Sequence, residues 1–241
     1  MVSAVSTSKN KSVIGIIQAR VGSMRLPGKV LLPLNGRPAI YRIISRVKKC
    51  KSLLRIYLAT SQNSENTPLV EIADKEGCGL YRGSENDVLS RFVDIVKQEG
   101  PDIVVRISAD NFAIDPNVIE HGIKKLLDEN LDICTAFINN SYPFGAGAEV
   151  STSGCLLRID SETKGKDVAY REHIYTFAYG NQDKYRIGTL KAPKGLRRPD
   201  INISVDSKKD YEKMKLLYEK LKNRESNFTT AELIKAWDSL L

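Results

Sequence analysis

The sequence predicts an α/β fold with an open, mostly parallel sheet that carries helices on both faces. Three features of the 241-residue chain support this prediction. Short apolar segments, each long enough for one buried strand, recur along the chain. Stretches with the helical spacing of apolar residues lie between them. The connections are short, as in consecutive strand–helix–strand units of one domain.

Five short apolar segments are expected to form strands. The first, Val13-Ile14-Gly15-Ile16-Ile17, has no polar side chain, which is typical of a strand buried on both faces. The other four are residues 55–60, 78–81, 102–107 and 131–136.

Helices are expected from apolar spacing and from capping residues. Pro38 suits the first turn of a helix whose apolar face holds Ile40, Ile43, Ile44 and Val47. Further helices are expected over residues 68–76, after the capping pattern Ser84-x-x-Asp87, after Asp115-Pro116, over residues 167–179, and after Ser207 and Thr229.

The region 140–206 has a less regular pattern. Residues 148–151 and 184–190 are expected to be antiparallel strands, and residues 202–206 a strand that ends at Asp206. Because no repeat or long linker is present, we expect residues 12–241 to form a single domain with an insertion at about 140–200. Residues 1–11 are expected to form a disordered tail.

Composition excludes several classes of protein. Hydrophobic residues make up 41% of the chain and charged residues 27%, as in an ordinary globular protein. No apolar run approaches the roughly 20 residues of a membrane-spanning helix, and the polar N-terminus lacks a secretory pattern. We therefore expect a cytoplasmic protein without membrane contact. Four scattered cysteines without a CxxC pair indicate reduced thiols, and neither a zinc site nor disulfides.

The positive charge is concentrated at one end of the chain. Residues 1–64 contain twelve Lys and Arg and no acidic residue, whereas the other 177 contain 25 basic and 29 acidic residues. Such asymmetry indicates a polyanionic partner for the N-terminal part, either a nucleic acid or a nucleoside triphosphate. A solvated basic face is the third interpretation.

The segment from Gln18 to Lys29, QARVGSMRLPGK, favours the triphosphate. It follows the first expected strand, at the sheet edge where open α/β proteins bind ligands. Its glycines allow backbone N–H groups to approach an anion, and Arg20, Arg25 and Lys29 add three cations within ten residues. The spacing matches neither a Walker A loop nor a GxGxxG loop.

Two aspartates complete this expected site. Asp110 and Asp206 each end an expected strand, so both should face the same crevice as the basic loop. Mg²⁺ prefers one or two carboxylates together with phosphate oxygens and water. The alternative is that both aspartates cap helices or turns.

Several segments together resemble one known family. QARVGSMRLPGKVL, RGSENDVLSR, RISADNFAIDP, YPFGAGAEV, REHI and ISVDSKKDYE occur in the order found in SpsF-like cytidylyltransferases, relatives of the CMP-acylneuraminate and CMP-Kdo synthetases. The resemblance covers about residues 13–220. It implies a Rossmann-like nucleotidyltransferase fold of the glycosyltransferase-A type, CTP as co-substrate, Mg²⁺ as cofactor, pyrophosphate as product, a role in polysaccharide biosynthesis, and a homodimer.

The resemblance also assigns roles to individual residues. It implies that Arg20, Arg25 and Lys29 are catalytic, by neutralising the leaving pyrophosphate. The nucleotide site would contain Gln18, Ala19, Arg20, Gly22, Ser23, Arg25, Lys29, Arg82, Gly83, Ser84 and Asp87. The acceptor site would contain Asn111, Glu149, Arg171, Glu172 and His173, and the metal ligands would be Asp110 and Asp206.

The acceptor half departs from the family pattern. The usual D-C-P-L reads Asp110-Asn111-Phe112-Ala113, and in the usual P-D-G-L-D-V-E two acidic positions have become Phe144 and Gly147. The acceptor is therefore expected to be acidic: a nonulosonic or other keto-acid sugar, or, since two carboxylates are lost, a phosphate or phosphonate.

Two other functions remain open from the sequence. The altered acceptor segments also fit a catalytically silent nucleotide-binding protein that keeps the fold. A nucleic-acid-binding module would use the basic N-terminal third. That stretch holds only Tyr41 and Tyr57 as aromatic residues and no RNP, KH or zinc-finger pattern, so we expect no nucleic-acid partner.

Overall fold

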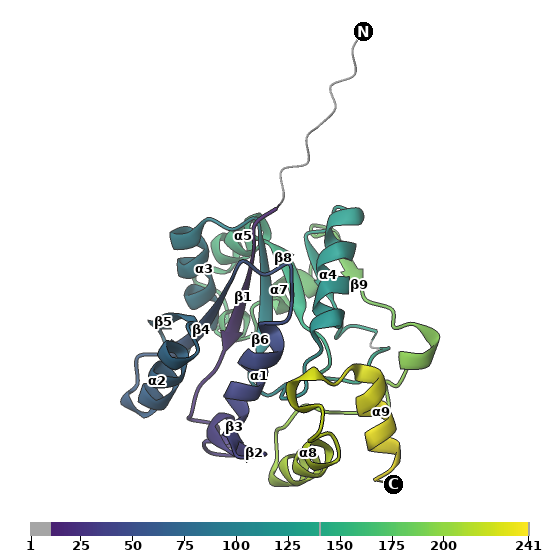
Figure 1. Ribbon diagram of the computed structural model, residues 1–241. Coiled ribbons are helices and arrows are strands. Elements are labelled where there is room, and N and C mark those ends of the chain that lie inside the picture. The colour runs from purple at the N-terminus through teal and green to yellow at the C-terminus, as the bar shows by residue number, and fades with distance from the viewer. Residues whose placement is uncertain (1–10, 140, 241) are drawn as a thin grey trace.

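A seven-stranded sheet forms the centre of the protein, in a computed structural model that describes residues 11–139 and 141–240 (Figure 1). The strand order is β5-β4-β1-β6-β8-β7-β9. Helices cover both faces, so the predicted α/β architecture is confirmed. The expected tail 1–11 lies, except for Lys11, outside the described residues. None of the described helices is both long and apolar enough to span a membrane.

Six of the seven strands run parallel to one another. They are β1 (Val13–Gln18), β4 (Arg55–Ser61), β5 (Gly79–Gly83), β6 (Ile103–Ser108), β7 (Ile133–Thr135) and β9 (Ile187–Thr189). Only β8 (Glu149–Thr152) is antiparallel, and it pairs with both β6 and β7. The antiparallel prediction was therefore right for residues 148–151. It was wrong for 184–190, because β9 pairs in parallel with β7.

Side chains of β1 alternate between two cores. Val13 and Ile17 pack into one core with helices α1 (Ala39–Val47), α2 (Thr67–Lys75), α4 (Pro116–Asp128), α8 (Lys208–Lys220) and α9 (Thr230–Asp238). Ile14 and Ile16 pack on the other face with α3 (Val88–Glu99), α5 (Ser153–Thr163) and α7 (Thr176–Tyr179). The apolar side chains of β1 thus pack against helices on both faces of the sheet, as its sequence predicts.

A small hairpin follows the basic loop. Strands β2 (Pro33–Leu34) and β3 (Arg37–Pro38) are joined by Asn35 and Gly36, both at positive φ, as an Asn-Gly hairpin turn requires. Figure 1 shows this hairpin beyond the lower end of β1, close to α8. The remaining short elements are α6 (Ala169–Glu172) and the 3-10 helices Lys29–Leu31, Ser64–Asn66, Lys194–Leu196 and Glu225–Asn227.

Three expectations about local structure were wrong, and one helix was not expected. Helix α3 begins at Val88, with Asp87 as its cap in place of Ser84. Residues 167–179 form the two short helices α6 and α7, because the chain leaves helical geometry at His173. Residues 202–206 are extended but form one isolated bridge, at Asn202, and no strand. Helix α5 was not expected, since polar Asp160 and Thr163 lie on its buried side.

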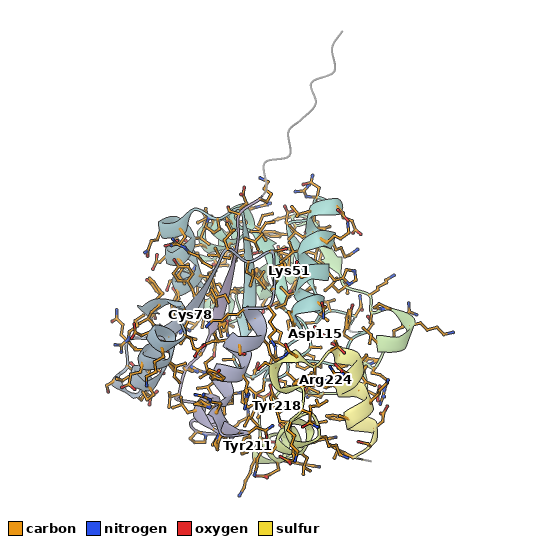
Figure 2. The ribbon with its side chains drawn as sticks, in the orientation of Figure 1. Lys51, Cys78, Asp115, Tyr211, Tyr218 and Arg224 are labelled. Carbon is orange, nitrogen blue, oxygen red and sulfur yellow. The ribbon has the colours of Figure 1, made fainter. Side chains whose placement is uncertain are left out.

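The buried guanidinium of Arg46 joins three chain segments. From α1 it donates hydrogen bonds to the carbonyls of Ile114, Ser226 and Phe228, and it stacks 3.7 Å from the centre of the Phe228 ring. Nearby, the Asp115 carboxylate caps α4 and also accepts from the backbone and side chain of Thr230 (Figure 2). These bonds fix α9 against the sheet domain.

Replacing Arg46 by Met should lower the free energy of unfolding by about 3 kcal/mol, because the buried carbonyls of Ile114 and Phe228 lose their donor. Urea denaturation of the purified variant measures this. Lys48→Met is the matched control: Lys48 pairs with Glu76 at the surface, so its loss should cost less than about 1 kcal/mol. Equal effects of the two substitutions would contradict the structural role of Arg46.

Candidate active site

The side chain of Lys29 connects the basic loop to both expected aspartates. Its ammonium donates to the Val205 carbonyl at 2.8 Å and to Asp206 Oδ1 at 3.0 Å, and lies 3.8 Å from Asp110 Oδ2. The Lys29 side chain is only 14% exposed. Arg25 reaches the same Asp206 oxygen at 2.9 Å but is largely exposed. The structure thus brings the basic loop and the two aspartates to one place.

The loop between β1 and the hairpin is held by its own backbone bonds. The Val21 carbonyl accepts from the N–H groups of both Ser23 and Gly28, and the Val21 N–H donates to Asn66 Oδ1. Gly28 has φ +68°, a conformation that side chains rarely tolerate. This turn directs Lys29 back toward the sheet.

The two aspartates lie close to each other but neither ends a strand. Asp110 sits in the turn after β6, and Asp206 follows the extended segment 202–205. The Val205 N–H donates to the Asp110 carbonyl at 2.9 Å, which sets the two segments side by side. Without a cation such a pair would repel. In this structure the Lys29 ammonium lies 3.8 Å from Asp110 and 3.0 Å from Asp206, and its positive charge relieves that repulsion.

Two adjoining cavities open at this cluster. The first, which we call the loop chamber, has a volume of about 400 Å³ and contains Arg20, Ser23, Arg25 and Lys29. The second, the aromatic chamber, has about 390 Å³ and contains Phe137, Phe144, Tyr175 and Tyr179. Both are lined by Arg106, Ser108, Asp110, His173 and Asp206. The aspartates therefore stand where the two chambers meet.

A buried ion pair forms one wall of the aromatic chamber. Arg106 on β6 pairs with Glu149 on β8 and donates to Gln18 on β1, so three neighbouring strands are connected. Burial disfavours the charge of Arg106, but the Glu149 carboxylate outweighs this and raises the Arg106 pKa. Tyr179 donates to Glu149, and burial beside that carboxylate raises the Tyr179 pKa. Arg106 is therefore already neutralised within the protein.

A smaller pocket of about 100 Å³, the helix pocket, lies beside the loop chamber. It is bounded by the end of β1, by Val88 and Arg91 of α3, and by Glu172 and His173. Arg20 bonds Glu85 at 2.9 Å and lies 3.7 Å from Glu172. The Ser61 and Arg20 hydrogen bonds lower the Glu85 pKa, although burial opposes them.

The structure separates the expected site residues into two groups. Those that line the chambers or the helix pocket are Gln18, Ala19, Arg20, Ser23, Arg25, Lys29, Asp110, Asn111, Glu149, Glu172, His173 and Asp206. The others have internal contacts. Arg82 donates to the carbonyls of residues 61–63, Ser84 accepts from the Asp87 N–H, and a Cβ on Gly22 would meet Glu65. Gly83 packs against Tyr81 and Arg91.

Asp87 and Arg171 belong to one network outside these cavities. Arg171 donates three hydrogen bonds to Asp87 and also pairs with Asp160 at 2.7 Å. These two carboxylates raise the Arg171 pKa against the opposing effect of burial. The network holds the α6 segment, with Glu172 and His173 beside the chambers, against the start of α3.

The two altered acceptor positions have different structural causes. A Cβ on Gly147 would lie 2.6 Å from the Ala136 Cβ and 3.0 Å from Val118, so a side chain does not fit there. Phe144 is 39% exposed and packs against Phe137 at the aromatic chamber, with the two rings tilted and their centres 5.4 Å apart. Packing thus excludes a carboxylate at position 147, and at position 144 an aromatic side chain stands in its place.

None of the four cysteines lines the two chambers or the helix pocket. All four are free, and Cys50 and Cys78 line a separate cavity of about 470 Å³ at the start of β4 and β5. Burial and the Glu120 hydrogen bond raise the Cys50 pKa to about 12, and burial raises that of Cys155 to about 12. Neither thiol is activated as a nucleophile.

Comparison with known proteins shows the family of this chain. The sequence model of the family described as "Cytidylyltransferase" matches residues 14–238. The chain belongs to the cytidylyltransferase family. It is therefore a nucleotidyltransferase, as its motifs predict, and its fold is that of this enzyme class.

Three relatives illustrate the similarity. The spore coat polysaccharide biosynthesis protein SpsF of Bacillus subtilis is 33% identical, over 92% of each chain. An 8-amino-3,8-dideoxy-manno-octulosonate cytidylyltransferase of Shewanella baltica is 30% identical, over 79% of this chain and 98% of its own. The solved structure of a cytidylyltransferase from Leptospira borgpetersenii superposes with a TM-score of 0.89 at 26% identity, over 95% of each chain.

Sequence reasoning missed several residues that line these cavities. Arg91 lies in the motif RGSENDVLSR, within an expected helix, and its local pattern does not predict that it lines a cavity. Arg106 and the aromatic residues of the second chamber carry no local signal, because only the packing of distant segments brings them together. The pairing of Arg20 with Glu85 could have been suspected, since both stand in motifs of the nucleotide half.

Substituting Gly147 by Asp should destabilise the protein by about 3 kcal/mol, because the side chain overlaps Ala136 and buries a charge. Phe144→Asp should cost about 1 kcal/mol, the scale of one aromatic contact at a half-open site. Thermal and urea unfolding measure both.

Gly195→Asp is the control for these two variants, since a Cβ there meets nothing within 4 Å. Its unfolding free energy should stay near that of the wild type. A stable Gly147→Asp variant would contradict the packing explanation for the lost carboxylate.

Proposed function

We propose that this enzyme transfers CMP from CTP to a hydroxyl group of a keto-acid sugar and releases pyrophosphate. The observation that carries the proposal is the meeting of two chambers at Asp110 and Asp206. One chamber holds the cations of the basic loop, and the other holds aromatic and polar side chains beside the Arg106–Glu149 ion pair. A reaction between a triphosphate and a second substrate needs such a junction.

The loop chamber suits the triphosphate. Arg20, Arg25 and Lys29 converge there from a single loop, and Ser23 adds a hydroxyl group. Arg25 and Lys29 already contact carboxylates, so they are positioned before the ligand arrives. Fixed cations of this kind stabilise the negative charge that grows on the leaving pyrophosphate.

Asp110 and Asp206 suit Mg²⁺, as the resemblance implies. Their carboxylates converge on one cation, the Lys29 ammonium, which shows that the position favours positive charge. Among the described residues no group of three or more His, Cys, Asp or Glu side chains could hold a metal. Mg²⁺ often completes its shell with phosphate oxygens and water, so two carboxylates suffice. When bound, it would neutralise the phosphate oxygens.

The aromatic chamber favours a sugar acid over a phosphate or phosphonate. Its arginine, Arg106, is paired with Glu149 and thus not available to a dianion. Phe137 and Phe144 offer apolar faces to a sugar ring, while Ser108, Asn111 and Thr176 offer hydrogen bonds to hydroxyl groups. The name of the Shewanella baltica relative, an octulosonate cytidylyltransferase, supports the same class.

The chemistry follows from this placement. A hydroxyl oxygen of the acceptor attacks the α-phosphorus in line, the bond to the β-phosphate oxygen breaks, and the hydroxyl proton is released to water. The protein's residues bind and orient the two substrates, and no protein nucleophile is needed. Homodimer formation remains a prediction from the resemblance, and a cytoplasmic location remains a prediction from composition and the N-terminal sequence.

The test is release of pyrophosphate from CTP in the presence of Mg²⁺ and a panel of acceptors. Keto-acid sugars should support turnover, whereas phosphates and phosphonates should not. CTP at 100 times its Kd should also stabilise the protein by about 2.7 kcal/mol, more than ATP, GTP or UTP at the same concentration. CTP-specific stabilisation without turnover on any acceptor would indicate a silent nucleotide-binding protein, and equal stabilisation by all four would contradict the proposal.

A further inference from the structure

Arg91 is a buried cation whose hydrogen bonding is incomplete. It lies on the second turn of α3, is 3% exposed, and its Nε atom has no hydrogen-bond partner in the part of the chain that the structure describes. Leaving a buried donor unpaired costs about 1–3 kcal/mol, and more for a charged group. A cost of this size indicates that the unpaired donor of Arg91 serves a function, such as binding a ligand.

Other buried arginines show what complete pairing looks like. Arg46 bonds three carbonyls, and Arg106 bonds Glu149 and Gln18. The acids nearest to Arg91 are bonded elsewhere: Glu85 accepts from Arg20, and Asp87 accepts from Arg171. Burial lowers the pKa of Arg91, with the neighbouring Arg20 charge acting in the same direction.

The unpaired side chain faces a cavity that the proposed function leaves unassigned. Arg91 lines the helix pocket of about 100 Å³, opposite the end of β1. That pocket shares Gln18, Ala19 and Arg20 with the loop chamber, where the triphosphate is proposed to bind. It has about a quarter of that chamber's volume, and a single flat ring suits it better than a chain of phosphates.

We propose that Arg91 binds the cytosine ring of CTP and sets the preference for cytosine over uracil. The assignment rests on the proposed function, in which CTP is the nucleotide. Cytosine presents two adjacent acceptors, the O2 carbonyl and the N3 ring nitrogen. A guanidinium offers two donors in a fixed planar arrangement that matches them. In uracil N3 carries a hydrogen, which would point at an Arg91 donor.

The experiment measures binding of three ligands, CTP, UTP and inorganic tripolyphosphate, by calorimetry with Mg²⁺. Arg91→Gln and Arg91→Lys should each weaken CTP binding by about tenfold to a hundredfold, the loss of hydrogen bonds to a charged donor. UTP and tripolyphosphate binding should change less than about threefold. The ratio of CTP to UTP affinity should therefore fall by about tenfold or more.

Lys97→Gln is the matched control, because it removes one exposed cation from the same helix. It should leave all three affinities unchanged. Arg91→Lys keeps the charge, so it remains informative if Arg91→Gln fails to fold.

The outcomes separate this inference from the proposed function. A wild-type protein that binds no CTP contradicts the proposed function. A wild type that prefers CTP, with variants that keep the same preference, overturns only the assignment of Arg91. If the variants lose affinity for all three ligands equally, the assignment of Arg91 to the cytosine ring is also overturned, because Arg91 would then act on the phosphates or on the fold.

Discussion

The ammonium of Lys29 is the contact on which the site depends. It joins the loop after β1 to the segment before α8, 177 residues further along the chain. The two carboxylates would repel each other, and so would the neighbouring cations. Here Lys29 and Arg25 lie against Asp110 and Asp206, so the opposite charges neutralise one another. Because Lys29 is largely buried, water screens the attraction less than at an exposed pair. The charges are therefore in position in the absence of a ligand.

Helix α8 supports both sides of this contact. Tyr211 donates to the Pro33 carbonyl and Tyr218 donates to the Phe112 carbonyl, while Asn35 donates to the carbonyl of Tyr218 (Figure 2). One helix thus holds the hairpin that follows the basic loop and the turn that follows Asp110. The C-terminal helices lie at this end of the sheet in Figure 1. Their packing accounts for the closeness of segments that are far apart in the sequence.

The sequence predicted features whose cause is local. The apolar segment 13–17 of strand β1, the hydrophobic face of α1, the Ser207 cap of α8 and the capping box of α9 depend on nearby residues, and all were found. Features set by distant packing were missed. The parallel orientation of β9 depends on its neighbour β7, and helix α5 buries Asp160, which pairs with Arg171 of a later segment. Arg91 looks like a surface residue of a helix until its burial is known.

The central claim is that Lys29 ties the basic loop to the acidic segment, and a double-mutant cycle in urea tests it most directly. Unfolding free energies are measured without ligand and with EDTA for Lys29→Met, Asp206→Asn and the double variant. We expect a coupling of about 1 kcal/mol, since the pair is partly buried. The exposed pair Lys124–Asp128 serves as reference and should give less than about 0.5 kcal/mol. Additive effects of the Lys29 and Asp206 substitutions would contradict the account.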